Sequence, residues 1–141
     1  MTIHRTWRDV AAVVTAGLVA ATLAGCATGY KANSPEATVK KRADARWQAL
    51  IAGDFDTAYK MTNPGYRQLT SLESFKKRFG GAGSWSDASV VKVDCEPQRC
   101  EVTIEVGLRP LVRGRMEEPV STAIKEIWIL EEGQWWQFQK L

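Results

Sequence analysis

Histidine is almost absent from this 141-residue chain, and its one copy, His4, lies in a segment that we expect to be removed. A mature chain without histidine has no imidazole to act as a base, as the partner of a nucleophile or as a metal ligand. The net charge of +3 is too small to predict nucleic-acid binding. The sequence also lacks a phosphate-binding loop, a serine elbow and metal-ligand spacing. We therefore expect no metal, no cofactor and no nucleic-acid partner.

A hydrophobic run long enough to span a bilayer is missing as well. Residues 10–23 are 14 consecutive uncharged residues, whereas a spanning helix needs about 20 apolar residues. The run follows Arg5 and Arg8 and ends in small residues, which is typical of a secretory signal. Its exit, Leu-Ala-Gly-Cys at residues 23–26, resembles the bacterial lipobox.

This resemblance implies a lipoprotein in which residues 1–25 are a signal peptide and Cys26 carries diacylglycerol, with an acyl chain such as palmitate on the new amine. Two or three acyl chains anchor a protein stably, since each buried CH₂ contributes roughly 0.8 kcal/mol. Ala27 follows the cysteine, and by resemblance to sorted lipoproteins this favours the outer membrane, facing the periplasm. The alternative is an ordinary signal peptide whose Cys26 pairs elsewhere. Residues 26–34 would hold the domain, residues 35–141, away from the lipid.

The two other cysteines, Cys95 and Cys100, bracket a predicted turn between two strands. Opposed residues of an antiparallel hairpin lie within disulfide range, and an oxidising compartment would preserve the bond. The alternative is a redox-active or metal-binding pair. Four intervening residues do not match the C-x-x-C spacing, so a structural disulfide is favoured.

Helical spacing comes first along the mature chain and strand alternation second. We predict helices that start after Ser34, Asp54 and Thr70, with Thr70 and Glu73 forming a capping box. Residues 63–65 (Asn-Pro-Gly) are expected to break the chain between helices, and residues 80–87 to form a flexible joint. Alternating segments then predict four antiparallel strands. The expected fold class is α+β, with three N-terminal helices packed on a curved four-stranded antiparallel sheet.

Several short motifs resemble the nuclear transport factor 2-like superfamily, which includes ketosteroid isomerase. They are Trp47 in the first helix, Ala-Gly-Asp-Phe at 52–55, Ala58-Tyr59 and Pro-Gly-Tyr-Arg at 64–67. The resemblance covers residues 35–141. It implies a cone in which a curved sheet wraps round the first helix and leaves a pocket at its open end. It implies no activity, because the fold hosts enzymes, binders and assembly modules.

Aromatic residues and one carboxylate are the pocket candidates. Glu126 is the carboxylate expected on an inward strand face; the alternative is that it lies near a sheet edge and pairs with Lys or Arg. Aromatic side chains could line a pocket for a hydrophobic small ligand, although aromatics at such spacing are also typical of a plain core. The candidates are Trp47, Tyr59, Phe75, Glu126 and Trp128.

Ile127 and Ile129 are interface candidates, because the alternation places them on the outer face of the sheet. They could mediate a homodimer or contact a periplasmic protein; the alternative is that other segments bury them. The function we expect is a non-catalytic binding or scaffolding module, lipid-anchored in the periplasm. The alternative is a small pocket enzyme of isomerase or dehydratase type acting on a hydrophobic molecule.

Overall fold

The computed structural model describes residues 33–79, 85–116 and 118–140. Cys26 and the leader expected over residues 1–25 lie outside these ranges, as do residues 80–84 of the expected flexible joint. No helix in the described part of the chain is long and apolar enough to cross a membrane.

Helices precede strands along the described chain, as the sequence predicts. The helices are α1 (Pro35–Ile51), α2 (Phe55–Lys60), α3 (Pro64–Leu69) and α4 (Leu72–Arg78). The strands are β1 (Trp85–Glu96), β2 (Arg99–Leu108), β3 (Leu111–Val112), β4 (Arg115–Met116), β5 (Val120–Glu131) and β6 (Gln134–Gln137). The domain is therefore α+β.

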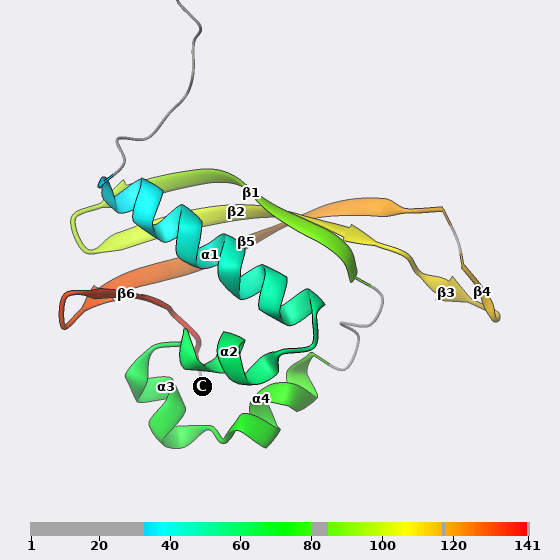
Figure 1. Ribbon diagram of the computed structural model, residues 1–141, viewed down its shortest axis with the longest axis horizontal. Helices are drawn as coiled ribbons and strands as arrows, with labels where there is room; N and C mark the ends of the chain where they lie inside the picture. Colours follow the sequence, from blue (N-terminus) through cyan, green and yellow to red (C-terminus); the bar gives the residue numbers. More distant parts are fainter. Residues whose placement is uncertain (1–32, 80–84, 117, 141) are drawn as a thin grey trace, which may run out of the picture.

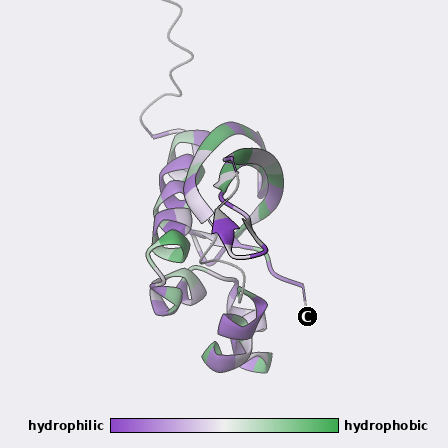
Figure 2. Ribbon diagram, turned by 90° about the vertical axis from the view of Figure 1, so that its right-hand side faces the viewer, coloured by the Kyte–Doolittle hydropathy of each residue, from purple (hydrophilic) through white to green (hydrophobic). Residues whose placement is uncertain are grey.

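The main sheet is antiparallel with strand order β1-β2-β5-β6, and β3 and β4 form a separate two-stranded hairpin. Helix α1 lies along this sheet, and α2, α3 and α4 gather below α1 (Figure 1). Seen from the side, the strands curl strongly next to α1 (Figure 2). This is the curved sheet that the sequence predicts.

The core lies between one face of α1 and the inner face of the sheet. Strand β2 alternates buried and more exposed residues along most of its length, as its sequence pattern predicts. Its inward side chains are fully buried together with Val39, Ala43 and Leu50 of α1. The inward β2 side chains are Cys100, Val102, Ile104 and Val106.

Two predicted helix starts are confirmed and one is corrected. The Ser34 hydroxyl accepts a hydrogen bond from the Ala37 N–H, and the Asp54 carboxylate accepts one from the Thr57 N–H, each at 3.1 Å. Hydrogen bonds from the side chain and the backbone N–H of Thr57 lower the pKa of the Asp54 carboxyl from its ordinary value. Helix α4 starts after Ser71 rather than Thr70, because the Ser71 hydroxyl accepts from the Ser74 N–H. Glu73 pairs with Lys76 instead of closing a capping box.

The described chain has four helices where three were expected. The residues predicted to break the chain do follow the end of α2, and they also start the additional helix α3, with Asn63 at its cap position and Pro64 in its first turn. Proline suits that position because its missing N–H would have no helical partner there anyway. Trp85 was expected in a flexible joint, but it begins β1. The β3–β4 hairpin was not predicted; it turns at Gly114, which has a φ of 76°.

Cys95 and Cys100 lie opposite each other in the β1–β2 hairpin and form a disulfide with an S–S distance of 2.01 Å. Cys100 is fully buried, and Cys95 is half-buried. No group of three or more possible metal-ligating side chains occurs among the described residues. The bond closes the β1–β2 hairpin beside the core.

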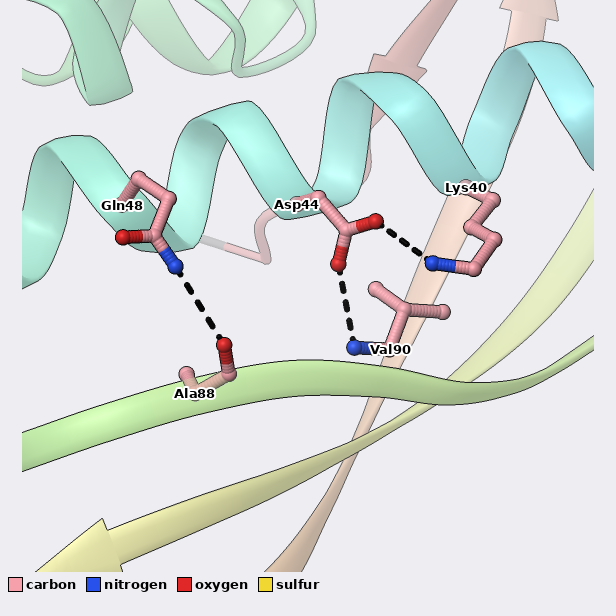
Figure 3. A network of polar contacts seen from close by, with 5 residues as sticks. All are labelled: Lys40, Asp44, Gln48, Ala88 and Val90. Carbon is pink, nitrogen blue, oxygen red and sulfur yellow. Dashed lines mark hydrogen bonds and ion pairs between the residues drawn. The ribbon is translucent and has the colours of Figure 1, made fainter.

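Side chains of α1 hydrogen-bond to the backbone of β1, which is an edge strand of the sheet (Figure 3). The Asp44 carboxylate accepts from the Val90 N–H at 3.0 Å and also pairs with Lys40 at 2.7 Å. The Gln48 side chain donates to the Ala88 carbonyl at 3.3 Å. These contacts satisfy backbone groups that a further strand would otherwise bind.

We predict that Asp44→Ala lowers the free energy of unfolding by about 1–2 kcal/mol, because it leaves the Val90 N–H without its charged acceptor. Asp44→Asn should lower the free energy of unfolding by less, since its amide oxygen can still accept the hydrogen bond from Val90. Urea denaturation followed by circular dichroism measures both changes.

Asp56→Ala is the matched control, because Asp56 also pairs with a lysine four residues away but contacts no strand in any described bond. It should change stability little, as exposed ion pairs contribute little. Equal losses of unfolding free energy in the Asp44 and Asp56 variants would show that the hydrogen bond from the Val90 N–H to Asp44 contributes nothing to stability.

Candidate functional site

A cleft of about 470 Å³ lies where α1, the end of α4, β5 and the C-terminal residues 137–140 meet. Its polar lining residues are Arg46, Arg78, Lys125, Glu126, Gln137, Gln139 and Lys140. Its apolar lining residues are Phe79, Ile124, Ile127 and Phe138. The volume is in the range of small-molecule sites in proteins.

A buried ion pair forms part of the cleft wall. Arg46 Nη1 of α1 donates to Glu126 Oε1 of β5 at 2.5 Å, and the two side chains are only 2% and 7% exposed. The second carboxylate oxygen, Oε2, accepts from the indole N–H of Trp128 at 3.2 Å. Both oxygens of Glu126 are thus held by donors, and the contact ties the first helix to the third strand of the main sheet.

Two buried polar atoms of the cleft residues have no hydrogen-bond partner among the described residues. They are Nε of Arg46, a donor, and Oε1 of Gln137, an acceptor. Gln137 is 5% exposed, and its amide nitrogen donates to the Phe138 carbonyl at 2.9 Å. Because buried polar groups in proteins are nearly always satisfied, these atoms favour a site that takes up a polar ligand or water.

The C-terminal wall of the cleft is fixed by backbone hydrogen bonds. The Gln137 N–H donates to the Met61 carbonyl, and the Asn63 N–H donates back to the Gln137 carbonyl, both at 2.9 Å. The Phe138 N–H donates to the Ile127 carbonyl at 2.7 Å, and the Gln139 N–H to the Asn63 side chain at 3.0 Å. The loop before α3 therefore positions this wall.

Positive charge is in excess among the described residues that line the cleft, which include four cationic side chains and one carboxylate. Arg46 is paired with Glu126, and Lys125 pairs with Glu101 at 2.6 Å. Arg78 and Lys140 are exposed. Arg78 lies over the Tyr66 ring at 5.5 Å and donates to the Lys140 carbonyl at 3.4 Å.

A second group of cations lies outside the cleft lining, around Trp136. The guanidinium carbons of Arg67 and Arg42 are 4.7 Å and 5.6 Å from the centre of its ring. Burial lowers the pKa of Arg42 from its ordinary value. Arg42 thus packs α1, and Arg67 packs α3, against Trp136 of β6.

Of the five pocket candidates, only Glu126 lines the cleft. Trp47, Phe75 and Trp128 are core residues, at most 3% exposed. Trp47 packs against Trp85, with ring centres 5.2 Å apart, and Phe75 packs between Tyr59 and Phe79. The Tyr59 hydroxyl donates to the Thr70 carbonyl at 2.6 Å. These aromatic side chains therefore belong to the core, which was the alternative to a pocket lining.

The two interface candidates are both half-buried. Ile127 borders the cleft, and Ile129 lies between Arg99 of β2 and Trp136 of β6 in the strand register. Next to them, the Lys125–Glu101 ion pair bridges β5 and β2. The outer face here therefore offers little exposed apolar surface.

Arg46 and Gln137 were not among the sequence-based candidates. The sequence does contain a pattern that identifies Arg46. It has the helical spacing of Val39, Ala43 and Leu50 and so shares the buried face of α1. A charged residue on such a face needs a buried partner. Gln137 carries no comparable signal, because its burial depends on the loop before α3.

We predict that Glu126→Gln and Arg46→Met each lower the free energy of unfolding by about 3–5 kcal/mol, because each leaves the other charge buried and unpaired. The glutamine keeps an acceptor for the Trp128 indole. Urea denaturation of the two single variants and the double variant completes a double-mutant cycle.

The free energy of unfolding of the double variant should fall by far less than the sum of the two single decreases, since the double variant leaves no unpaired charge. Additive losses, agreeing within about 0.5 kcal/mol, would contradict a direct interaction between the two groups.

No family model and no curated protein matches the chain. Several solved structures are similar to the chain. A SEC-C motif containing protein from Rhodopseudomonas palustris has a TM-score of 0.55 at 19% identity, over 78% of this chain and 79% of that one. A Xanthomonas campestris protein, provisionally described as a calcium/calmodulin dependent protein kinase II association domain, has a TM-score of 0.53 at 12% identity, over 77% and 86%.

An NTF2-like protein from Campylobacter jejuni, provisionally described as a transpeptidase, has a TM-score of 0.51 at 10% identity, over 72% of this chain and 98% of that one. Identities this low transfer no activity. The similarities concern the fold, and the α+β chain has the nuclear transport factor 2-like fold that its sequence motifs resemble.

Proposed function

We propose that the protein is a lipid-anchored, non-catalytic binding module of the bacterial cell envelope and that the cleft holds a small, partly apolar ligand. The observation that carries this proposal is the pair of buried, unpartnered atoms, Arg46 Nε and Gln137 Oε1, in the lining of one cleft. A ligand that reaches both atoms would satisfy a donor and an acceptor that the described residues leave without a partner.

The ion pair supports binding more than catalysis. A general base has to take a proton from its substrate. Glu126 is held at one oxygen by the Arg46 guanidinium and at the other by the Trp128 indole. Protonating it would leave a buried arginine without its counter-charge, which is unfavourable. In this proposal Glu126 therefore orients Arg46.

A small pocket enzyme of isomerase or dehydratase type is the second candidate. One observation favours it: Glu126 is an inward carboxylate bordering an open cleft. In that case the carboxylate would have to exchange Arg46 for substrate during the reaction. No tyrosine is among the described residues that line the cleft, so a donor for a developing oxyanion would have to be an arginine, lysine or amide side chain of the lining, such as Arg46.

The anchoring part of the proposal is supported by the sequence of residues 10–26, with its apolar run and Leu-Ala-Gly-Cys exit. The Cys95–Cys100 disulfide agrees with it, because such bonds persist in the periplasm and are rare in the cytosol. A lipid on Cys26 would tether the domain to a membrane surface through residues 26–34.

We predict that Cys26→Ser moves the protein out of the membrane fraction, because serine cannot carry the thioether-linked lipid. Fractionation of cells and intact mass measurement of the purified protein test this. An unchanged membrane fraction, together with a wild-type mass that shows no lipid, would contradict the anchor.

We predict that the purified full-length protein retains a small molecule and that Gln139→Trp reduces its amount at least ten-fold, because the indole fills the cleft. Gln139 is half-buried in the C-terminal wall. Mass spectrometry of the extracted small molecules measures retention.

Val91→Trp is the matched control, since it adds the same side chain at a position of β1 that is 55% exposed. It should leave retention unchanged. Equal retention by the Gln139 and Val91 variants, or no retained molecule in the wild type, would contradict the binding role of the cleft.

A further inference from the structure

Resting on the binding role proposed for the cleft, we infer that its ligand is an amphipathic anion: a carboxylate or phosphate group joined to a compact apolar body. The inference starts from the charges around the cleft. Two of the four cationic residues, Arg46 and Lys125, already pair with carboxylates. The other two, Arg78 and Lys140, form no ion pair with an acidic side chain of the described chain.

Arg78 and Lys140 belong to the same rim of the cleft, because the Arg78 guanidinium donates to the Lys140 backbone carbonyl. Two unpaired cations beside a cleft attract anionic ligands and repel cationic ones. The effect is stronger in a recess than on an open surface, because the low-dielectric walls focus the field. The rim therefore selects the sign of the ligand's charge.

The buried Arg46 adds a directional contact. Its Nη1 is occupied by Glu126, while its Nε has no acceptor among the described residues. A guanidinium presents its N–H groups in a rigid plane that matches the oxygens of carboxylate and phosphate. An anionic oxygen at Nε would form a charge-assisted hydrogen bond, which is stronger than a bond to a neutral acceptor.

The rest of the ligand is apolar and small. Phe79 follows α4, Ile124 lies in β5 and Phe138 follows β6, and all three line the same cleft as the cations. The volume of about 470 Å³ suits a compact molecule and not a polymer. A ligand whose charged head lies at the rim or at Arg46, and whose apolar body packs against these side chains, would contact both the cationic and the apolar parts of the cleft.

Four six-carbon probes that share a chain and differ in their head group test the inference: hexanoate, hexyl phosphate, hexanol and hexylammonium. Calorimetric titration into the full-length protein in lipid nanodiscs, with titration into empty discs subtracted, measures their binding. We expect both anions to bind at least ten-fold more tightly than the alcohol and the amine. Added salt should weaken the anions, since it screens the exposed rim.

The double variant Arg78→Gln/Lys140→Gln should weaken hexanoate at least ten-fold. The matched control, Lys41→Gln/Lys77→Gln, removes the same charge from exposed residues that are not in the cleft lining, and it should change affinity less than three-fold. Both pairs lie on the surface, so the fold should be kept.

Hexanol binding as tightly as hexanoate, equal effects of the two double variants, or no binding of any probe would each overturn the assignment of an anion. None of these results decides whether the cleft binds a ligand at all. That question is answered separately by the Gln139→Trp retention measurement, which uses no probe.

Discussion

The buried ion pair between Arg46 and Glu126 is the constraint on which the rest of this domain depends. Two charges held almost entirely away from water are stable only while each satisfies the other. The pair joins residues 80 positions apart, one on the first helix and one on β5. It therefore fixes the rotation of α1 over the sheet, which in turn directs Val39, Ala43 and Leu50 into the core. Trp128, fully buried beside the pair, donates to the same carboxylate, so the charges and the apolar core share one packed contact.

The cleft exists because the sheet is incomplete at this point. Strand β6 pairs with β5 over Trp128–Glu131, and one further backbone hydrogen bond joins Phe138 to Ile127, while Gln137 bonds to the loop before α3. The first half of β5 consequently has a strand on one side only, and the C-terminal residues form a wall at a distance from it. At the opposite edge of the sheet, the side chains of Asp44 and Gln48 in α1 hydrogen-bond directly to the backbone of β1 (Figure 3). One edge is closed by helix side chains, and the other borders a recess.

This arrangement gives the charged residues different roles. Glu126 neutralises and orients Arg46, whose Nε–H has no acceptor among the described residues. Arg78 and Lys140 lie at the exposed rim, where charge acts over distance and remains sensitive to salt. A fixed internal donor and an exposed cationic rim suit recognition of one charged group on a small molecule. They suit proton transfer less well, since the only buried carboxylate of the described cleft is engaged at both oxygens.

Much of the fold could be predicted from the sequence, because it depends on local patterns. The α+β order, the helix starts at Ser34 and Asp54 and the opposition of Cys95 and Cys100 all follow from spacing within a few residues. Even local signals were ambiguous where two structures use the same residue: Pro64 can end a helix or begin one, and here it begins α3.

The site could be predicted only in part. The alternation of β5 indicated that Glu126 faces inward and named a cationic partner as one alternative, yet nothing local identified Arg46 as that partner. Trp47, Phe75 and Trp128 have the spacing of buried residues, but whether a buried aromatic borders a cavity depends on what packs against it from elsewhere in the chain. Local sequence thus determined which residues are buried and in which elements, while only the tertiary structure decided which buried groups meet, because those contacts join segments that are far apart along the chain.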